Sequence, residues 1–310
     1  MARVVDGSGL PPDVTGSVVT VGTFDGVHRG HVALLERLVE RARAARLHAV
    51  LVTFEPHPLE VVNPAAAPPL LTVGPERLEV LAETGVDFVA VLPFTHDLQR
   101  LSADEFVNRV LLERFRMREL WMGHDHHFGR NRSGDVALLR TIGAARGFQV
   151  EVLPPVTASE GLAISSTAIR RAIAGGDLAH AAEALGRPYS IAGRVVPGAG
   201  RGRAMGFRTI NVALPSPRKL LPPEGVYVVR VQTPHGSFGG MMNLGPRPTF
   251  GDAAVQLEAH LFDADGDFYE LPVRVDVIGW LRETQKFSGP DALSAQLRLD
   301  EIAARNALTR

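Results

Sequence analysis

Between residue 17 and about residue 174, short apolar runs alternate with amphipathic stretches. The apolar runs are rich in β-branched residues and predict strands over 17–21, 48–54, 86–92, 119–122 and 148–153. Between them, apolar residues recur at intervals of three and four, which predicts helices over 32–43, 75–84, 103–115 and 134–146. This alternation is typical of an α/β domain whose helices cover a mostly parallel sheet. The proline-rich stretch 63–71 is predicted to be a surface loop.

The pattern changes near Gly186, after the stretch 164–186. Short alternating runs then predict an antiparallel β unit, with strands over 225–233, 257–265 and 271–280. The final stretch, 290–308, returns to helical spacing. We therefore expect two domains, 1–186 and 187–310.

Composition narrows the class of protein. The chain has no run of 18 apolar residues, and residues 1–13 lack the apolar core of a signal peptide, so neither a membrane span nor secretion is expected. It has no cysteine, which excludes disulfides, thiolate metal sites and cysteine nucleophiles. These features predict a cytoplasmic protein.

The charge balance disfavours nucleic acid as a partner. The formal net charge is −1, so no strong basic field surrounds the chain. Lys219 and Lys286 are the two lysines, and neither follows a glycine as the phosphate-binding G-x-x-x-x-G-K-[ST] loop requires. A P-loop nucleotidase is therefore excluded.

The stretch GTFDGVHRGH, residues 22–31, joins a predicted strand to a predicted helix. Such a turn presents backbone N–H groups and the positive end of a helix dipole, which suits a phosphate. If the helix begins by Val27 or His28, His28 and His31 share one face and are able to donate to the same phosphate. The alternative is that the glycines only form a turn and that the histidines are solvated.

The same stretch resembles the H-x-G-H signature of nucleotidylyltransferases. Its longer form, G-x-F-D-G-x-H-x-G-H, resembles the bacterial bifunctional riboflavin kinase/FAD synthetase family. Three further segments resemble that family in the same order, at 53–58, 123–135 and 164–170. The resemblance implies a Rossmann-like domain that transfers AMP from ATP to FMN and yields FAD and pyrophosphate.

The resemblance also implies roles for residues of this first domain. His28 and His31 are expected to neutralise the ATP phosphates as catalytic residues. Nucleotide contacts are expected from the rest of the turn, at Gly22, Phe24, Asp25, Gly26 and Gly30. Ser166, Thr167 and Arg170 are expected to hold the leaving pyrophosphate, although an ordinary helix cap also explains the two hydroxyl residues.

The cluster at residues 124–127 contains three histidines and Asp125. The resemblance implies that Asp125 faces the flavin nucleotide. A zinc site is the alternative, but zinc ligands usually come from separate elements, and the chain has no cysteine.

A second glycine-rich stretch, residues 193–212, resembles the flavokinase signature, in which a flap leads into G-F-P-T-x-N. By this resemblance Thr209 and Asn211 bind Mg²⁺ and the ATP phosphates, and further contacts come from Gly198, Arg201 and Gly206. Arg208 stands where the family usually has proline, which frees one backbone dihedral. A β-hairpin with permissive turns is the alternative for the glycines.

The stretch LEAHLFDADGDFYE, residues 257–270, resembles the strand of that family that carries the catalytic base, which falls on Glu258. His260 lies two residues on, so strand alternation places both side chains on one face. Glu270 stands where the family often has glycine. A solvent-facing strand glutamate is the alternative for Glu258. The resemblance implies a small β-barrel with a C-terminal helix.

The sequence thus predicts an enzyme that phosphorylates riboflavin to FMN and then adenylates FMN to FAD, with ATP as co-substrate and Mg²⁺ as cofactor. The expected partners are riboflavin, FMN, FAD and ATP, without nucleic acid or membrane, and a weak homo-oligomer stays open. A first alternative, motivated by Arg208 and Glu270, is an FAD synthetase whose second domain only binds flavin. A tRNA-charging protein and a flavin-storage module are further alternatives. The scarcity of lysine argues against the tRNA-charging protein.

Overall fold

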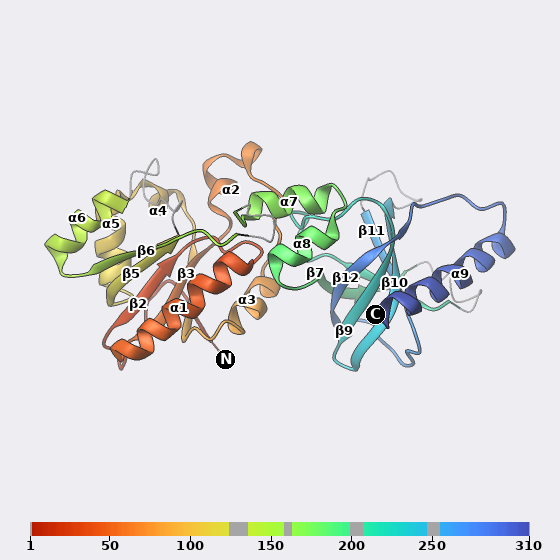
Figure 1. The fold of residues 1–310 in the computed structure, drawn as a ribbon, viewed down its shortest axis with the longest axis horizontal. Coiled ribbons are helices and arrows are strands. Elements are labelled where there is room, and N and C mark those ends of the chain that lie inside the picture. The colour runs from red at the N-terminus through yellow and green to blue at the C-terminus, as the bar shows by residue number, and fades with distance from the viewer. Residues whose placement is uncertain (1, 124–135, 158–162, 199–206, 247–254, 310) are drawn as a thin grey trace. The chain divides into compact units, whose positions relative to one another are not determined.

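The computed structural model describes residues 2–123, 136–157, 163–198, 207–246 and 255–309. The chain forms two compact units, Met1–Ser166 and Thr167–Arg310 (Figure 1). The predicted boundary at Gly186 lies further along the chain, beyond two helices that group with the second unit, and it stays a prediction.

The first unit is built on a six-stranded parallel sheet with the strand order β1-β4-β3-β2-β5-β6. Its strands are β1 (Arg3–Val5), β2 (Ser17–Val21), β3 (His48–Glu55), β4 (Phe88–Pro93), β5 (Met117–Gly123) and β6 (Gln149–Leu153). The chain runs outward from β2 through β3 to β4, and then returns to the other side of β2 for β5 and β6. The order therefore reverses between β2 and β5, which is where open α/β sheets bind ligands.

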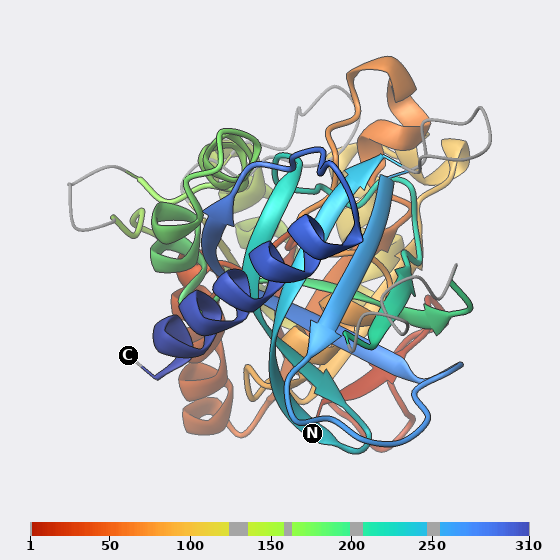
Figure 2. The ribbon, with the colours of Figure 1, turned by 90° about the vertical axis from the view of Figure 1, so that its right-hand side faces the viewer.

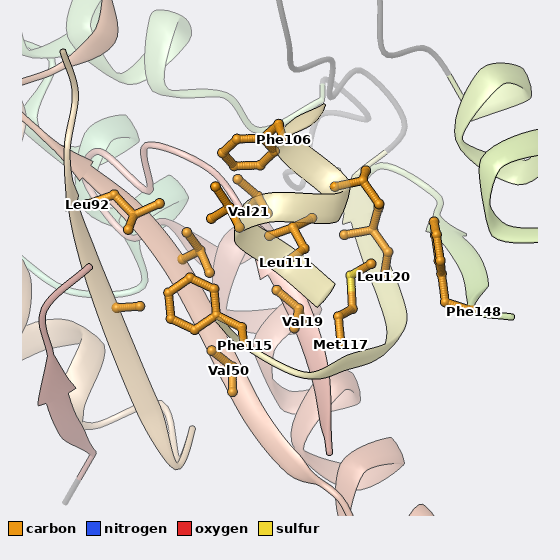
Figure 3. Close-up of a cluster of buried hydrophobic side chains, with 14 of the residues drawn as sticks. Val19, Val21, Val50, Leu92, Phe106, Leu111, Phe115, Met117, Leu120 and Phe148 are labelled. Atoms are coloured by element: carbon orange, nitrogen blue, oxygen red, sulfur yellow. The ribbon is translucent and has the colours of Figure 1, made fainter. Parts of the chain in front are cut away.

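Helices cover both faces of this sheet. The helices of this unit are α1 (Arg29–Ala45), α2 (Pro58–Val62), α3 (Pro75–Ala82), α4 (His96–Arg100), α5 (Ala103–Phe106) and α6 (Val136–Arg146), with a 3-10 turn η1 (Pro64–Ala66) and a π-helical turn η2 (Val107–Leu112). Side chains of α1 and α3 pack on one face of the sheet. Side chains of α5, η2 and α6 pack on the other, where Phe115, Leu111 and Val19 are fully buried (Figure 3). Because both faces are covered, the strands read as continuous apolar runs.

The second unit is a closed barrel of six strands in the order β10-β11-β8-β7-β12-β9, all paired antiparallel. The strands are β7 (Tyr189–Val196), β8 (Thr209–Ala213), β9 (Gly225–Thr233), β10 (Gly236–Pro246), β11 (Val255–Leu261) and β12 (Pro272–Arg282). Alternate side chains fill the barrel, among them Tyr227, Val229, Met242 and Ala259. The predicted α/β domain followed by an antiparallel barrel is confirmed.

In the described part of the chain, three helices accompany the barrel. Helix α7 (Ser166–Ala174) begins at the boundary between the units, and α8 (Leu178–Leu185) packs against β7 and β12. Helix α9 (Pro290–Leu308) has the bounds that its spacing predicted, and it lies along the outside of the barrel against β9, β10 and β12 (Figure 2). None of the described helices is long and apolar enough to cross a membrane.

Three details differ from the expectations. Strand β1 was not predicted, because three residues at a sheet edge carry no readable periodicity. The stretch 63–71 is only partly a surface loop, since Leu70 and Leu71 are buried. The helix predicted over 103–115 is an α-helical turn that continues as the π-helical turn η2.

Candidate active sites

The first candidate site is the turn between β2 and α1. Helix α1 begins at Arg29, and His28 caps it by accepting the N–H of His31 on Nδ1 at 3.3 Å. The two imidazole rings stack, with centroids 3.7 Å apart and planes at 15°. The helix begins one residue later than the prediction required, yet the two rings are brought together. Because Nδ1 of His28 accepts, the proton of the neutral ring sits on Nε2.

Gly30 is needed for this arrangement. A Cβ at Gly30 would lie 3.1 Å from Nδ1 of His28. That distance is tighter than ordinary contact, so a side chain here would press on the capping ring. Gly22, at the end of the strand, lies against the ring of Phe24.

The turn holds a strained backbone. Phe24 and Val27 have φ values of 47° and 41°, which residues with a Cβ rarely adopt. Both side chains are buried, so packing against the core compensates for the strain. Strain of this kind clusters at sites where the backbone must follow a ligand rather than its own preference.

Asp25 is a structural anchor of the turn. Its carboxylate is buried and accepts hydrogen bonds from the backbone N–H groups of Leu71 and Thr72, at 3.1 and 2.9 Å. The N–H of Gly26 donates in turn to the hydroxyl of Thr72 at 3.0 Å. These bonds fasten the turn to the 70–73 segment, and the nucleotide contact expected of Asp25 stays a prediction.

Arg77 is a second anchor, which the sequence analysis missed. Its guanidinium is buried and donates to the backbone carbonyls of Thr23 and Phe54 at 3.1 and 3.0 Å, and to Glu55 Oε2 at 2.6 Å. It therefore joins the turn after β2 to the end of β3. A signal was present, because Arg77 lies one helical turn before the buried Leu81, at an inward-facing position of α3.

The first residue of α7 also reaches the turn. The hydroxyl of Ser166, the first residue of α7, donates to the backbone carbonyl of Asp25 at 2.9 Å. Thr167 and Arg170 follow on the same helix, within the second compact unit. Ser166 thus lies at the turn, and the pyrophosphate role of these three residues stays a prediction.

The predicted flavin-facing residue lies outside the described residues. Strand β5 ends at Gly123, next to β2 and at the point where the strand order reverses. The cluster 124–127 with Asp125 follows it directly, so neither the flavin contact nor the zinc alternative is tested. Among the residues that the structure describes, no group of three or more His, Asp or Glu side chains is arranged to hold a metal ion.

The second candidate site is on the outer face of the barrel. Asn211 of β8 stands opposite Glu258 of β11, and Thr209 stands opposite His260. Residues directly opposite each other in an antiparallel pair share a face, so these four side chains lie together. The neighbours between them, such as Ile210 and Ala259, point into the barrel core and are buried.

Two hydrogen bonds fix the polar groups on this face. The hydroxyl of Thr209 donates to Glu258 Oε1 at 2.5 Å. The amide of Gln256 donates to Asn211 Oδ1. The structure therefore joins three residues that the sequence proposed separately, Thr209, Asn211 and Glu258.

Gly198 is packed directly against Asn211. A Cβ at Gly198 would lie 1.8 Å from Nδ2 of Asn211, so no other residue fits without displacing that side chain. Within the glycine-rich stretch 193–212, Gly198 is the last described residue before 199–206. Arg201 and Gly206 lie in 199–206, outside the described residues.

His260 anchors the start of β8. Its Nδ1 donates to the backbone carbonyl of Arg208 at 2.7 Å, which fixes the residue that precedes Thr209. A cavity of about 280 Å³ opens beside this point. It is lined by residues of β7, β8 and the β11–β12 connection, among them Arg208, Thr209, Phe268 and Tyr269.

Glu270 and Arg208, the two departures from the flavokinase pattern, lie in different local structures. Glu270 has φ 61°, the left-handed conformation that favours glycine, which explains why glycine suits this position. Its backbone N–H still donates to the carbonyl of Val195 at 3.0 Å, so the turn is kept. Arg208 is exposed and forms an ion pair with Asp265 at 3.5 Å.

The residues of the barrel face suit a magnesium ion by their donor chemistry. Mg²⁺ prefers oxygen ligands and is usually held by one or two protein groups together with substrate phosphates and water. Thr209, Asn211 and Glu258 place a hydroxyl, an amide and a carboxylate on one face. This set fits the ion.

Comparison with known proteins assigns each half of the chain to a known family model. Residues 10–168 match the family model described as FAD synthetase, and residues 185–308 match the one described as riboflavin kinase. The chain belongs to the bifunctional riboflavin kinase/FAD synthetase family. The two matched ranges together contain the turn after β2 and the outer barrel face.

Relatives in this family match almost the whole chain. The bifunctional riboflavin kinase/FMN adenylyltransferase of Pseudomonas fluorescens is 42% identical over 96% of this chain and 94% of its own length. That of Escherichia coli K12 is 41% identical over 94% and 92%. A crystal structure described as that of a macrolide-efflux protein from Streptococcus pneumoniae shares the fold, with a TM-score of 0.86 and 31% identity over 98% of this chain and 99% of that one.

Proposed function

We propose that this protein phosphorylates riboflavin with ATP to give FMN and then transfers AMP from a second ATP to FMN, giving FAD and pyrophosphate. The observation that carries this proposal is the 42% identity to a bifunctional riboflavin kinase/FMN adenylyltransferase over 96% of the chain. Both halves of the chain are included in that match. ATP is the co-substrate of both reactions.

Adenylyl transfer would take place at the turn between β2 and α1. The phosphate of FMN is already an anion, so the reaction needs alignment with the α-phosphorus of ATP and stabilisation of the departing pyrophosphate, and it needs no base. The oxygen of FMN forms the new P–O bond as the bond to pyrophosphate breaks. The stacked rings of His28 and His31, with the start of α1, supply donors and the positive end of a helix dipole for these charges.

Ser166, Thr167 and Arg170 belong to the same proposal. Ser166 lies at the start of α7 and is bonded to the carbonyl of Asp25 in the turn. An arginine one turn into a helix presents a planar fork that suits a pyrophosphate. Asp125 remains the proposed flavin contact.

Phosphoryl transfer would take place on the outer face of the barrel. The ribityl hydroxyl of riboflavin is neutral and must lose its proton as its oxygen attacks the γ-phosphorus, while the bond between that phosphorus and ADP breaks. Glu258 takes the proton, because its carboxylate stands on the exposed side of the barrel among polar groups. Thr209 holds the carboxylate in position through its hydroxyl.

Mg²⁺ is proposed as the cofactor of this step, held by Thr209 and Asn211. When bound, it supplies positive charge against the phosphate oxygens. The lining of the 280 Å³ cavity includes two aromatic side chains, Phe268 and Tyr269, so we assign the cavity to the base of ATP. Thr209 at the edge of the cavity would then lie on the phosphate side.

One experiment separates this function from its main alternative. The protein is incubated with riboflavin, ATP and MgCl₂, and FMN, FAD, ADP and pyrophosphate are quantified. The proposal requires one ADP for each flavin phosphorylated and one pyrophosphate for each FAD. A parallel incubation replaces riboflavin with FMN; FAD formed only there, without ADP, would leave an FAD synthetase with a flavin-binding barrel. No consumption of ATP would indicate a flavin-storage protein.

The remaining expectations belong to the same proposal. They are a cytoplasmic location, supported by the absence of cysteine, and function without nucleic acid or membrane, supported by a net charge of −1. A weak homo-oligomer stays open.

A further inference from the structure

Arg208 places a positive charge at a position where the flavokinase pattern usually has an uncharged residue. Proline is usual there and has no charged group, whereas this chain has a guanidinium at the start of β8. The side chain lines the 280 Å³ cavity together with Thr209 and the aromatic pair Phe268 and Tyr269. It is therefore close to the place where the proposed function puts ATP.

The position of the Arg208 backbone is fixed, while its side chain is held weakly. His260 binds the backbone carbonyl of Arg208 at 2.7 Å. The guanidinium is 64% exposed, and its partner in the ion pair, Asp265, is 99% exposed. At 3.5 Å and in solvent, such a pair contributes little to stability and is easily exchanged.

Asp265 is satisfied without Arg208. Its Oδ1 also accepts the N–H of Gly266 at 2.9 Å, and the carboxylate is open to solvent. Release of the guanidinium therefore leaves no buried charge behind. A phosphate, in contrast, offers an arginine two parallel hydrogen bonds and a larger charge than one carboxylate.

We infer that Arg208 is an additional ATP-binding residue of the kinase site, which exchanges Asp265 for a phosphate of the nucleotide when ATP enters the cavity. Asp265 competes with the nucleotide for the guanidinium. Arg208 thus sets the affinity for ATP in the first reaction. This inference rests on the proposed kinase function.

Two single variants and their combination test the exchange. For Arg208→Ala, KM for ATP in FMN formation is expected to rise about tenfold, with kcat and KM for riboflavin near wild type, because a charge-assisted contact to the nucleotide is lost. For Asp265→Asn, KM for ATP is expected to fall about two- to threefold, because a competitor is removed. The double variant is expected to have the same KM for ATP as Arg208→Ala, because without Arg208 there is no guanidinium for Asp265 to bind.

Direct binding gives a readout independent of turnover. The affinity of the full-length protein for ADP, measured by calorimetry with and without added KCl, is expected to weaken in Arg208→Ala and to lose part of its salt dependence. Arg208→Lys keeps the charge without the fork and is expected to lie between wild type and Arg208→Ala. FAD formation from supplied FMN is the internal control and is expected to be unchanged in all variants.

The outcomes are distinct. If wild type forms no FMN, the proposed kinase function is wrong. If wild type forms FMN and Arg208→Ala keeps its KM for ATP, or changes the KM for riboflavin instead, the exchange is wrong while the function stands. An unchanged KM for ATP in Asp265→Asn would also overturn it, since the competition would then be absent.

Discussion

The hydroxyl of Thr209 donates a hydrogen bond to Glu258 Oε1 at 2.5 Å, across two neighbouring strands of the barrel. One contact therefore joins the proposed magnesium ligand to the proposed base. Because the hydroxyl proton of Thr209 is used in the bond to Glu258, the lone pairs of the hydroxyl oxygen point away from the carboxylate and are available to a ligand. The carboxylate in turn is held in one orientation, ready to accept a proton on its other oxygen.

Replacement of Glu258 by glutamine should separate the two activities. Glutamine still accepts the bond from Thr209 but cannot take a proton, so FMN formation is expected to fall about 10²- to 10⁴-fold. FAD formation from supplied FMN should be unchanged, as measured by chromatography of the flavins. Glu224→Gln, an exposed position of the same unit, serves as the control. Wild-type rates of FMN formation in Glu258→Gln would show that another group is the base.

Replacement of Gly198 by alanine should impair the kinase through Asn211. The new methyl group would displace the Asn211 side chain, and we expect FMN formation to fall about 10- to 100-fold, as misplaced ligand groups generally cause. Gly279→Ala is the matched control, because a Cβ at Gly279 of β12 meets no atom within 4 Å. Equal rates for the two variants would mean that Asn211 need not hold its observed position.

Replacement of His28 by asparagine should affect only the second reaction. Asparagine is a good N-cap, so α1 should persist and the free energy of unfolding should change little. The imidazole donor is lost, however, and FAD formation is expected to fall about 10²-fold, the usual cost of one donor to developing charge. His96→Asn in the exposed α4 is the control. The assignment fails if both variants make FAD at the same rate.

Replacement of Arg77 by methionine should destabilise the first unit. The backbone carbonyls of Thr23 and Phe54 would lose their donor, and we expect a loss of about 2–3 kcal/mol in the free energy of unfolding, measured with urea. Arg100→Met breaks an ion pair whose side chains are 77% and 94% exposed, and should cost about 0.5 kcal/mol or less. A similar loss in both variants would contradict the anchoring role of Arg77.

Stability at alkaline pH should depend on Tyr227. Burial in the barrel raises the pKa of Tyr227 to about 12, above its ordinary value of 10.0. The neutral phenol is thus favoured by folding, so its stabilising contribution is complete below pH 10 and is lost as the pH rises toward 12. Urea unfolding of wild type and Tyr227→Phe between pH 9 and pH 12 should show a smaller decline in the variant. Parallel curves would mean that other groups cause the alkaline loss.

Secondary-structure elements that follow from a local hydrophobic pattern could be predicted from the sequence. The strand over 17–21, the helix over 290–308 and the change from parallel to antiparallel strands all follow from periodicity within a short window. The resemblance supplied Glu258 on one strand and Thr209 and Asn211 on another, and strand alternation placed Glu258 and His260 on one face.

The contacts that lock these residues in place could not be predicted. Asp25 binds Leu71 and Thr72, and Arg77 binds Thr23, across 46 or more positions of chain in each case. Such partners are set by how strands and helices pack, which no local window contains. The bond between Thr209 and Glu258 likewise depends on the register of two strands.

The closure of the barrel affects where aggregation of the protein should begin. In a closed ring every strand has two neighbours, so no row of backbone groups is left to recruit a strand from another molecule. The parallel sheet, by contrast, ends in β1 and β6. Misassembly after heating should therefore start from the adenylyl-transferring half, and riboflavin phosphorylation should outlast FAD production in ageing samples.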